Sequence, residues 1–174
     1  MDFPARIVVM GVTASGKTEV GTALGERLGY RFVDSDALHP KSNIEKMKRG
    51  EPLDDDDRAP WLDRVGETLA EANGEGGTIV ACSALKRAYR DRIRRAAPDA
   101  VFVLLHADRH VLKERIESRP HHFMPPSLLD SQLNTLEQPG EDEPVVSVGV
   151  QVPMETVVQR TIARLGALKS ERAG

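Results

Sequence analysis

A glycine-rich segment with a lysine carries the first chemical signal in the chain. Residues 11–18 read Gly-Val-Thr-Ala-Ser-Gly-Lys-Thr, which matches the phosphate-binding pattern G-x-x-x-x-G-K-[ST]. An apolar run at 7–10 predicts a strand before it, and the spacing over 17–28 predicts a helix after it. A chance turn is the alternative, but this context favours phosphate binding by backbone N–H groups. The predicted nucleotide-binding residues are Gly11, Val12, Thr13, Ala14, Ser15, Gly16, Lys17 and Thr18.

Two carboxylates follow the next apolar run, at Asp34 and Asp36. Strand alternation places both on the same side, at the lip of the sheet beside the phosphate loop. One carboxylate can orient an acceptor hydroxyl and take its proton, while the other holds Mg²⁺ together with the hydroxyl of Thr18. We predict Asp36 as the base because it lies further out, and Asp34 as the metal residue. A solvated turn or a helix N-cap is the alternative.

Polar residues in the segment after these aspartates, about 37–60, are candidates for binding an acceptor. Arg58 can grip a carboxylate in bidentate fashion, although an ion pair with one of the aspartates at 54–57 is an equal alternative. His39 is as easily structural as functional. Trp61 is expected in the core rather than stacked on a ligand.

Three polar residues follow the third apolar run, namely Ser83, Lys86 and Arg90. Their spacing of i, i+3 and i+7 puts them on one helix face if the helix begins near Ser83. That face would suit a hydroxylated anion. A nucleic-acid surface is disfavoured because Tyr89 is the only interleaved aromatic residue and the net charge is −3.

Arg115 and Arg119 are one helical turn apart and precede a loop rich in proline and histidine. This pattern predicts a lid at about 115–127, which closes over a triphosphate, excludes water and neutralises charge on the transferred group. Surface ion pairs with Glu114 and Glu117 are the alternative.

Strands and helices alternate along the chain. Apolar runs at 7–10, 32–33, 78–82, 101–105 and 145–150 alternate with helical patterns at 17–28, 56–73, 86–96, 109–118, 127–136 and 154–168. Repeated β-α units predict an α/β domain with a parallel sheet, whose ligands bind at the carboxyl ends of the strands. The length of 174 residues suits one domain, 1–174.

Composition excludes several classes of protein. The pI of about 6.0 gives no basic field for nucleic acid, and no apolar stretch is long enough to span a membrane. The single cysteine, Cys82, fits a reducing compartment, and no apolar signal core is visible near residue 1. We therefore expect a cytoplasmic protein that binds neither nucleic acid nor membrane.

Several blocks of the sequence together resemble the bacterial gluconate kinases, the small thermoresistant-type gluconokinases of the P-loop kinase superfamily. Besides the phosphate loop, they are Asp-Ser-Asp-x-Leu-His-Pro at 34–40, Asn-Ile-Glu-Lys-Met at 43–47, Gly-Glu-Pro-Leu-x-Asp-x-Asp-Arg-x-Pro-Trp-Leu at 50–62, Cys-Ser-Ala-Leu-Lys-x-x-Tyr-Arg at 82–90 and His-Phe-Met-Pro at 122–125. The resemblance implies phosphorylation of D-gluconate to 6-phosphogluconate with ATP and Mg²⁺. It also implies a three-layer fold of the nucleoside-monophosphate-kinase type, with five parallel strands in the order 2-3-1-4-5, a mobile lid and a homodimer.

The resemblance fits the residues singled out above. Arg58, Lys86 and Arg90 could hold the gluconate carboxylate, Asp36 and His39 could meet hydroxyls, and Gln132 could reach in from the helix after the lid. Two departures from the family pattern stand out. Ala14 replaces a frequent glycine, and Val-Gly-Val-Gln-Val-Pro at 148–153 replaces an Asp-rich run that passes the adenine. The second change puts side-chain contacts to the base in doubt.

Three other functions compete with this interpretation. A shikimate kinase would normally carry a Gly-Gly-Gly turn where this chain has Cys-Ser-Ala at 82–84. A nucleoside-monophosphate kinase would need an acceptor pocket the size of a base, for which this chain is short and its acceptor segment very acidic. A nucleotide-binding regulator without turnover would need neither the paired aspartates nor the lid arginines.

Overall fold

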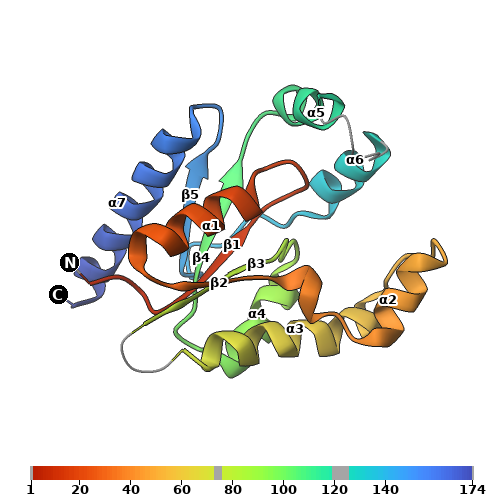
Figure 1. Cartoon of the computed structure of the whole chain (residues 1–174), viewed down its shortest axis with the longest axis horizontal. Coiled ribbons are helices and arrows are strands. Elements are labelled where there is room, and N and C mark those ends of the chain that lie inside the picture. Colours follow the sequence, from red (N-terminus) through yellow and green to blue (C-terminus); the bar gives the residue numbers. More distant parts are fainter. Residues whose placement is uncertain (1, 73–75, 119–125, 174) are drawn as a thin grey trace.

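A parallel sheet of five strands forms the centre of the molecule, with the strands in the order β2-β3-β1-β4-β5 (Figure 1). The computed structural model describes all residues except 1, 73–75, 119–125 and 174. The strands are β1 (Arg6–Met10), β2 (Arg31–Asp34), β3 (Thr78–Ala81), β4 (Val101–His106) and β5 (Val145–Gly149). Each pairs with its neighbours in parallel, with Val8 of β1 opposite Val80 of β3 and Phe102 of β4. The predicted fold class and strand order are confirmed.

Helices cover both faces of this sheet. The described helices are α1 (Lys17–Leu28), the short 3₁₀ helix η1 (Ser35–Leu38), α2 (Lys41–Lys48), α3 (Asp55–Ala70), α4 (Arg87–Ala96), α5 (Arg109–Glu117), α6 (Pro126–Thr135) and α7 (Met154–Ala173). The period of two in β1 explains the two cores. Val8 and Met10 pack with α3 and α4, whereas Ile7 and Val9 pack with α1 and α7. Both faces of β1 are therefore buried, as the continuous apolar run predicts.

Three helices extend from the carboxyl edge of the sheet, where ligands bind in this class of fold (Figure 1). Helix α2 lies apart, beyond η1 and the start of α3. Helices α5 and α6 lie on the other side and share a small apolar cluster with the phosphate loop, which includes Val12, Leu112 and Leu129. No helix among the described residues is long and apolar enough to cross a membrane.

Two predicted helix starts differ from the structure. Helix α4 begins at Arg87, with Lys86 as its N-cap, which is one residue after the predicted start at 86 and four residues after Ser83. Helix α3 begins at Asp55 because Asp54 and Asp57 form a capping box there, each accepting a hydrogen bond from the backbone N–H of the other. The shift in α4 changes which residues can share the face predicted above.

Close packing of α3 on α4 gives a prediction about stability. A Cβ atom added at Gly66 would lie 2.7 Å from the backbone oxygen of Ile93. Alanine normally favours a helix by about 1 kcal/mol over glycine, but overpacking costs about 1–3 kcal/mol. We expect Gly66→Ala to lower the free energy of unfolding by about 1–2 kcal/mol in urea titrations. An unchanged or raised midpoint would show that the two helices can separate freely.

Candidate active site

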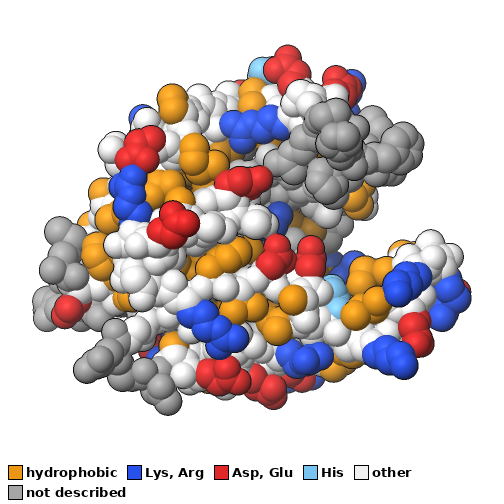
Figure 2. All heavy atoms as spheres, viewed as in Figure 1, with side chains coloured by type: hydrophobic (Ala, Val, Ile, Leu, Met, Phe, Trp, Pro, Cys, Tyr) orange, Lys and Arg blue, Asp and Glu red, His pale blue; other side chains and the backbone are white. Residues whose placement is uncertain are grey.

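A cavity of about 590 Å³ opens at the carboxyl ends of β1, β2 and β3. Figure 2 shows the hollow from its open side, between the part of the molecule that carries α2 and the part above it. The lining comes from segments far apart in the chain, which the topology brings together. It includes Thr13, Ala14, Gly16, Lys17, Thr18, Asp34, Asp36, Met47, Trp61, Cys82, Ser83, Ile116 and Gln132.

The phosphate loop forms one wall of this cavity. Gly11 has φ +148°, and a Cβ there would lie 2.8 Å from the oxygen of Leu105, so only glycine fits. Ala14 adopts φ +64°, a left-handed conformation that glycine adopts at lower cost. Lys17 donates from Nζ to the carbonyl oxygens of Gly11 at 3.0 Å and Val12 at 3.1 Å, and burial lowers its pKa. The loop thus holds its lysine against its own backbone.

Thr18 and the two aspartates lie side by side on the cavity wall. The Thr18 hydroxyl donates to Asp34 Oδ2 at 3.1 Å, and the backbone N–H of Asp36 donates to Asp34 Oδ1 at 3.0 Å. Asp34 therefore caps η1, as the alternative interpretation of this pair allowed, and still faces Thr18. A hydroxyl and a carboxylate this close are oxygen donors of the kind that Mg²⁺ prefers.

The environment of Asp36 favours a carboxylate that can take a proton. Burial raises its pKa, and the nearby charge of Asp34 raises it further, while His39 and Lys17 act in the opposite direction. Both aspartates line the cavity as predicted, although Asp36 is placed there by η1 and not by strand alternation, because β2 ends at Asp34.

His39 lies beside the cavity, stacked on Trp61 with ring centroids 4.4 Å apart and 12° between the planes. Asn43 fixes its tautomer. The amide nitrogen of Asn43 donates to the carbonyl oxygen of Asp57 at 2.9 Å and lies 3.2 Å from His39 Nδ1. Because that nitrogen can only donate, Nδ1 accepts and the proton of the neutral ring sits on Nε2. Burial lowers the pKa of His39, which agrees with a neutral ring.

Trp61 lies in the core, as predicted. It is 6% exposed and packs in the core, where its Nε1 donates to the carbonyl oxygen of Ser35 at 2.7 Å. The same side chain contributes to the cavity lining.

Arg58 and Lys86 meet around the ring of Tyr89 rather than on the cavity wall itself. Both also face Asp55, so the ion pair with a neighbouring aspartate that stood as the alternative for Arg58 is present, with 3.8 Å between its charged atoms. Ser83 lines the cavity. The sequence did not single out Tyr89 or Asp55 as site residues, although both stand in the blocks at 50–62 and 82–90.

The prediction for Arg90 as a ligand of a substrate carboxylate is wrong. Arg90 is 0% exposed, and its guanidinium donates to Glu143 Oε1 at 2.8 Å and to the carbonyl oxygens of Ala84 and Glu137 at 2.9 and 3.0 Å. Because α4 begins at Arg87, Ser83 lies before the helix, and Arg90 does not share a helix face with it or line the cavity.

Arg115 does not line the cavity that contains Asp36. It donates to the carbonyl oxygen of Val150 and lines a second cavity of about 280 Å³. The other lining residues come from the phosphate loop, the start of α1, the start of α7 and the segment before α7: Ala14, Ser15, Gly16, Glu19, Val20, Val150, Val152, Met154 and Val157. Arg119 and most of the predicted lid lie outside the described residues.

Two glutamines bind backbone N–H groups near the cavities. Gln132 on α6 lines the larger cavity and accepts from the backbone N–H of Thr13 in the phosphate loop at 2.6 Å. Gln151 accepts from the backbone N–H of Asp108 at 2.8 Å. Gln151 therefore ties the end of β5 to the start of α5.

Comparison with known proteins gives consistent matches over nearly the whole chain. The family model for an AAA domain matches residues 7–139. A gluconokinase of Gluconobacter oxydans is 46% identical over 165 residues, which cover 94% of this chain and 93% of the relative. The thermoresistant gluconokinase of Escherichia coli is 42% identical, covering 89% and 90% of the two chains. The crystal structure of a gluconokinase from Sinorhizobium meliloti superposes with a TM-score of 0.89 at 48% identity and covers 99% and 98% of the two chains.

Proposed function

The chain belongs to the gluconokinase family, and from this premise we propose how its cavity transfers the γ-phosphoryl group of ATP to the 6-hydroxyl of D-gluconate. The observation that carries the proposal is one cavity in which a phosphate loop faces a carboxylate, Asp36, whose pKa burial raises. A phosphate loop supplies the donor, and such a carboxylate suits an acceptor hydroxyl.

The donor half consists of the phosphate loop and the second cavity. Backbone N–H groups at 11–18 and the N-terminus of α1 bind the phosphates, and Lys17 leaves its backbone partners for the β- and γ-phosphates. The apolar lining of the second cavity suits the base, with Arg115 beside it. We assign Arg119 to the lid with Arg115 on sequence grounds.

Thr18 and Asp34 would hold Mg²⁺, because their oxygens lie together beside the loop. The ion, when bound, neutralises charge on the phosphate oxygens.

The acceptor half consists of Asp36, His39 and the cationic residues beyond them. The primary alcohol of gluconate has a high pKa, so Asp36 mainly orients the hydroxyl and takes its proton late, as the bond to phosphorus forms. The Nε2–H of His39 is available to another hydroxyl, and Ser83 and Gln132 face the same cavity. Arg58 and Lys86 supply positive charge for the carboxylate.

A homodimer and a cytoplasmic location complete the proposal. The homodimer rests on the family resemblance. The cytoplasmic location rests on the composition of the chain, and the buried free thiol of Cys82 is compatible with a reducing compartment. Light scattering on the purified protein measures the oligomeric state directly.

The reaction is tested by ADP release in a coupled assay. The purified protein receives ATP and Mg²⁺ with gluconate, shikimate, glycerate, pantothenate or a nucleoside monophosphate in turn. We expect turnover with gluconate well above every other acceptor, and 6-phosphogluconate as the product in mass spectrometry. Absence of gluconate-dependent ADP release would overturn the assignment.

A further inference from the structure

Two hydrogen-bond donors and a further cation converge on one carboxylate oxygen at the start of α3. Asp55 Oδ1 accepts from the Tyr89 hydroxyl at 2.5 Å and from Lys86 Nζ at 3.5 Å, and it lies 3.8 Å from Arg58 Nη1. The hydrogen bond from Tyr89, and then the charges of Lys86 and Arg58, lower the pKa of Asp55. Tyr89, Lys86 and Arg58 therefore form a binding site for an anion, and in this structure the carboxylate of Asp55 occupies it.

The donors are anchored, whereas the anion is exposed. Tyr89 is 8% exposed and packs in the core, and both cations lie over its ring, at 5.7 Å for Arg58 and 5.5 Å for Lys86. The side chain of Asp55 is 65% exposed. Helix α3 does not need Asp55 as its cap, because Asp54 and Asp57 form the capping box. The carboxylate of Asp55 can therefore move away without breaking the helix start.

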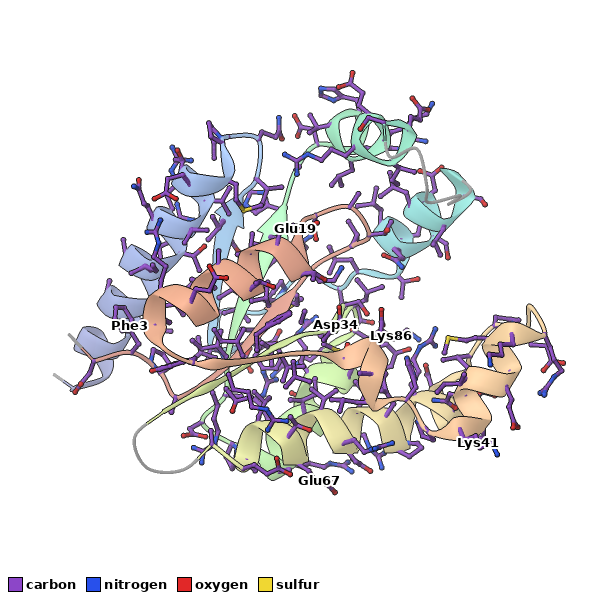
Figure 3. The ribbon with its side chains drawn as sticks, viewed as in Figure 1. Phe3, Glu19, Asp34, Lys41, Glu67 and Lys86 are labelled. Carbon is purple, nitrogen blue, oxygen red and sulfur yellow. The ribbon has the colours of Figure 1, made fainter. Side chains whose placement is uncertain are left out.

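The position of this group suits the far end of the acceptor. Ser83 lines the cavity three residues before Lys86, and Trp61 lines it three residues after Arg58. Figure 3 shows Asp34 and Lys86 at the edge of the sheet towards α2. In gluconate the carboxylate and the phosphorylated hydroxyl stand at opposite ends of the carbon chain. When the reacting hydroxyl of gluconate lies at Asp36, the carboxylate of gluconate must therefore be bound at a distance from the phosphate loop.

We propose that the Tyr89 hydroxyl, Arg58 and Lys86 form the carboxylate subsite for the acceptor, and that Asp55 occupies it as an internal counter-ion until gluconate displaces it. The inference rests on the proposed function of the same cavity. While Asp55 is in place, the charges of Arg58, Lys86 and Asp55 sum to a single positive charge. The incoming gluconate carboxylate then replaces Asp55 as the partner of the two cations. A neutral polyol has no charge with which to displace Asp55, so the exchange selects for an acid.

The proposal predicts opposite changes in gluconate affinity for two conservative variants. Asp55→Asn removes the competing charge and is expected to tighten gluconate binding about two- to fivefold, the range of an exposed ion pair. Tyr89→Phe keeps the ring but removes a donor to a charged group, and is expected to weaken binding about tenfold. Isothermal titration calorimetry of the full chain with gluconate measures the affinity of each variant, and the coupled assay gives its KM for gluconate.

Asp63→Asn is the matched control. Asp63 accepts from Arg92 Nε at 2.8 Å and joins the same two helices, α3 and α4, away from the Tyr89 ring. The Asp63→Asn variant is expected to bind gluconate as tightly as the unmodified enzyme does. D-Glucitol, which carries a hydroxymethyl group in place of the carboxylate, serves as a competing ligand. Its affinity is expected to stay the same in the Asp55 and Tyr89 variants.

Each outcome has a distinct meaning. If Asp55→Asn weakens gluconate binding as Tyr89→Phe does, Asp55 only holds the cations in place and the exchange is overturned. If both variants behave like Asp63→Asn, or if D-glucitol changes in parallel with gluconate, the carboxylate subsite lies elsewhere. Failure of the unmodified enzyme to bind and phosphorylate gluconate would refute the proposed function instead.

Discussion

Replacing Asp36 by asparagine is expected to lower kcat about 10²–10⁴-fold while the fold stays intact. The amide keeps the size of the side chain, and the backbone hydrogen bond from Asp36 to Asp34 does not involve the group that changes. What is lost is the group that orients the acceptor hydroxyl and takes its proton. The coupled assay measures kcat, and circular dichroism checks the fold. Preservation of kcat within about threefold would show that Asp36 is not the base.

The pH dependence of kcat tests the same role independently. Only the ionised carboxylate can take a proton, so activity falls as the pH drops through the pKa of Asp36. Burial and then the charge of Asp34 raise that pKa, so the acid limb lies at a higher pH than for an ordinary aspartate. Asp36→Asn should lose this limb in its residual activity, whereas Asp63→Asn should keep both the limb and full kcat.

The donor half of the site was predictable because its signals are local. A phosphate loop needs its strand, its glycines and its helix within a short stretch of chain, and the spacing at 11–18 contains them. Asp34 and Asp36 both line the cavity as predicted, but β2 ends at Asp34 and Asp36 lies in η1, so the period of two in a strand does not account for Asp36. The strand order came from the family resemblance, because alternation alone predicts a parallel sheet without its order.

The parts that the sequence could not predict depend on distant partners. Arg90 was assigned to the cavity from a helix start near Ser83, but the helix begins four residues later and turns Arg90 towards Glu143, 53 residues away. Nothing near Arg90 in the sequence indicates that partner. The contact of Arg115 with the carbonyl oxygen of Val150 is equally remote. Tyr89 was recognised only as part of a motif, because its partners Arg58 and Asp55 come from another helix.

The buried Arg90–Glu143 pair connects two segments that adjoin the active site. Arg90 donates to the carbonyl oxygens of Ala84 and Leu85, in the loop that carries Ser83 into the cavity. It also donates to the carbonyl oxygen of Glu137, in the segment that follows α6. Glu143 is held in turn by the backbone N–H of Gly140 at 2.9 Å. We therefore assign Arg90 a structural role in place of the ligand role predicted for it.

The acid sensitivity of this pair follows from Glu143. Burial alone raises the pKa of its carboxyl, but hydrogen bonds from Arg90 and Gly140 outweigh burial and bring the pKa from the ordinary 4.5 down to about 2. A lowered pKa in the folded state stabilises the fold above the ordinary value. That stabilisation is lost as the pH falls from about 4.5 towards 2.

Arg90→Met is accordingly expected to destabilise the protein by about 3–5 kcal/mol, because it leaves the Glu143 carboxylate buried without its main partner. For a chain of this length that corresponds to a fall in Tm of roughly 6–20 °C. The double variant Arg90→Met with Glu143→Leu should recover part of the loss, since no buried charge remains, but not the hydrogen bonds to the three carbonyl oxygens. It should also lose less stability between pH 4.5 and 2 than the unmodified protein.

Arg94→Met provides the matched control for this prediction. Arg94 also contacts Glu143 Oε1, at 3.3 Å, but its side chain is 16% exposed and its loss leaves the pair with Arg90 in place. Its Tm should therefore fall much less than that of Arg90→Met in thermal unfolding followed by circular dichroism. Equal losses in the two variants would mean that Glu143 does not depend on Arg90 in particular. A stable Arg90→Met protein with a raised KM for gluconate would instead return Arg90 to the acceptor site.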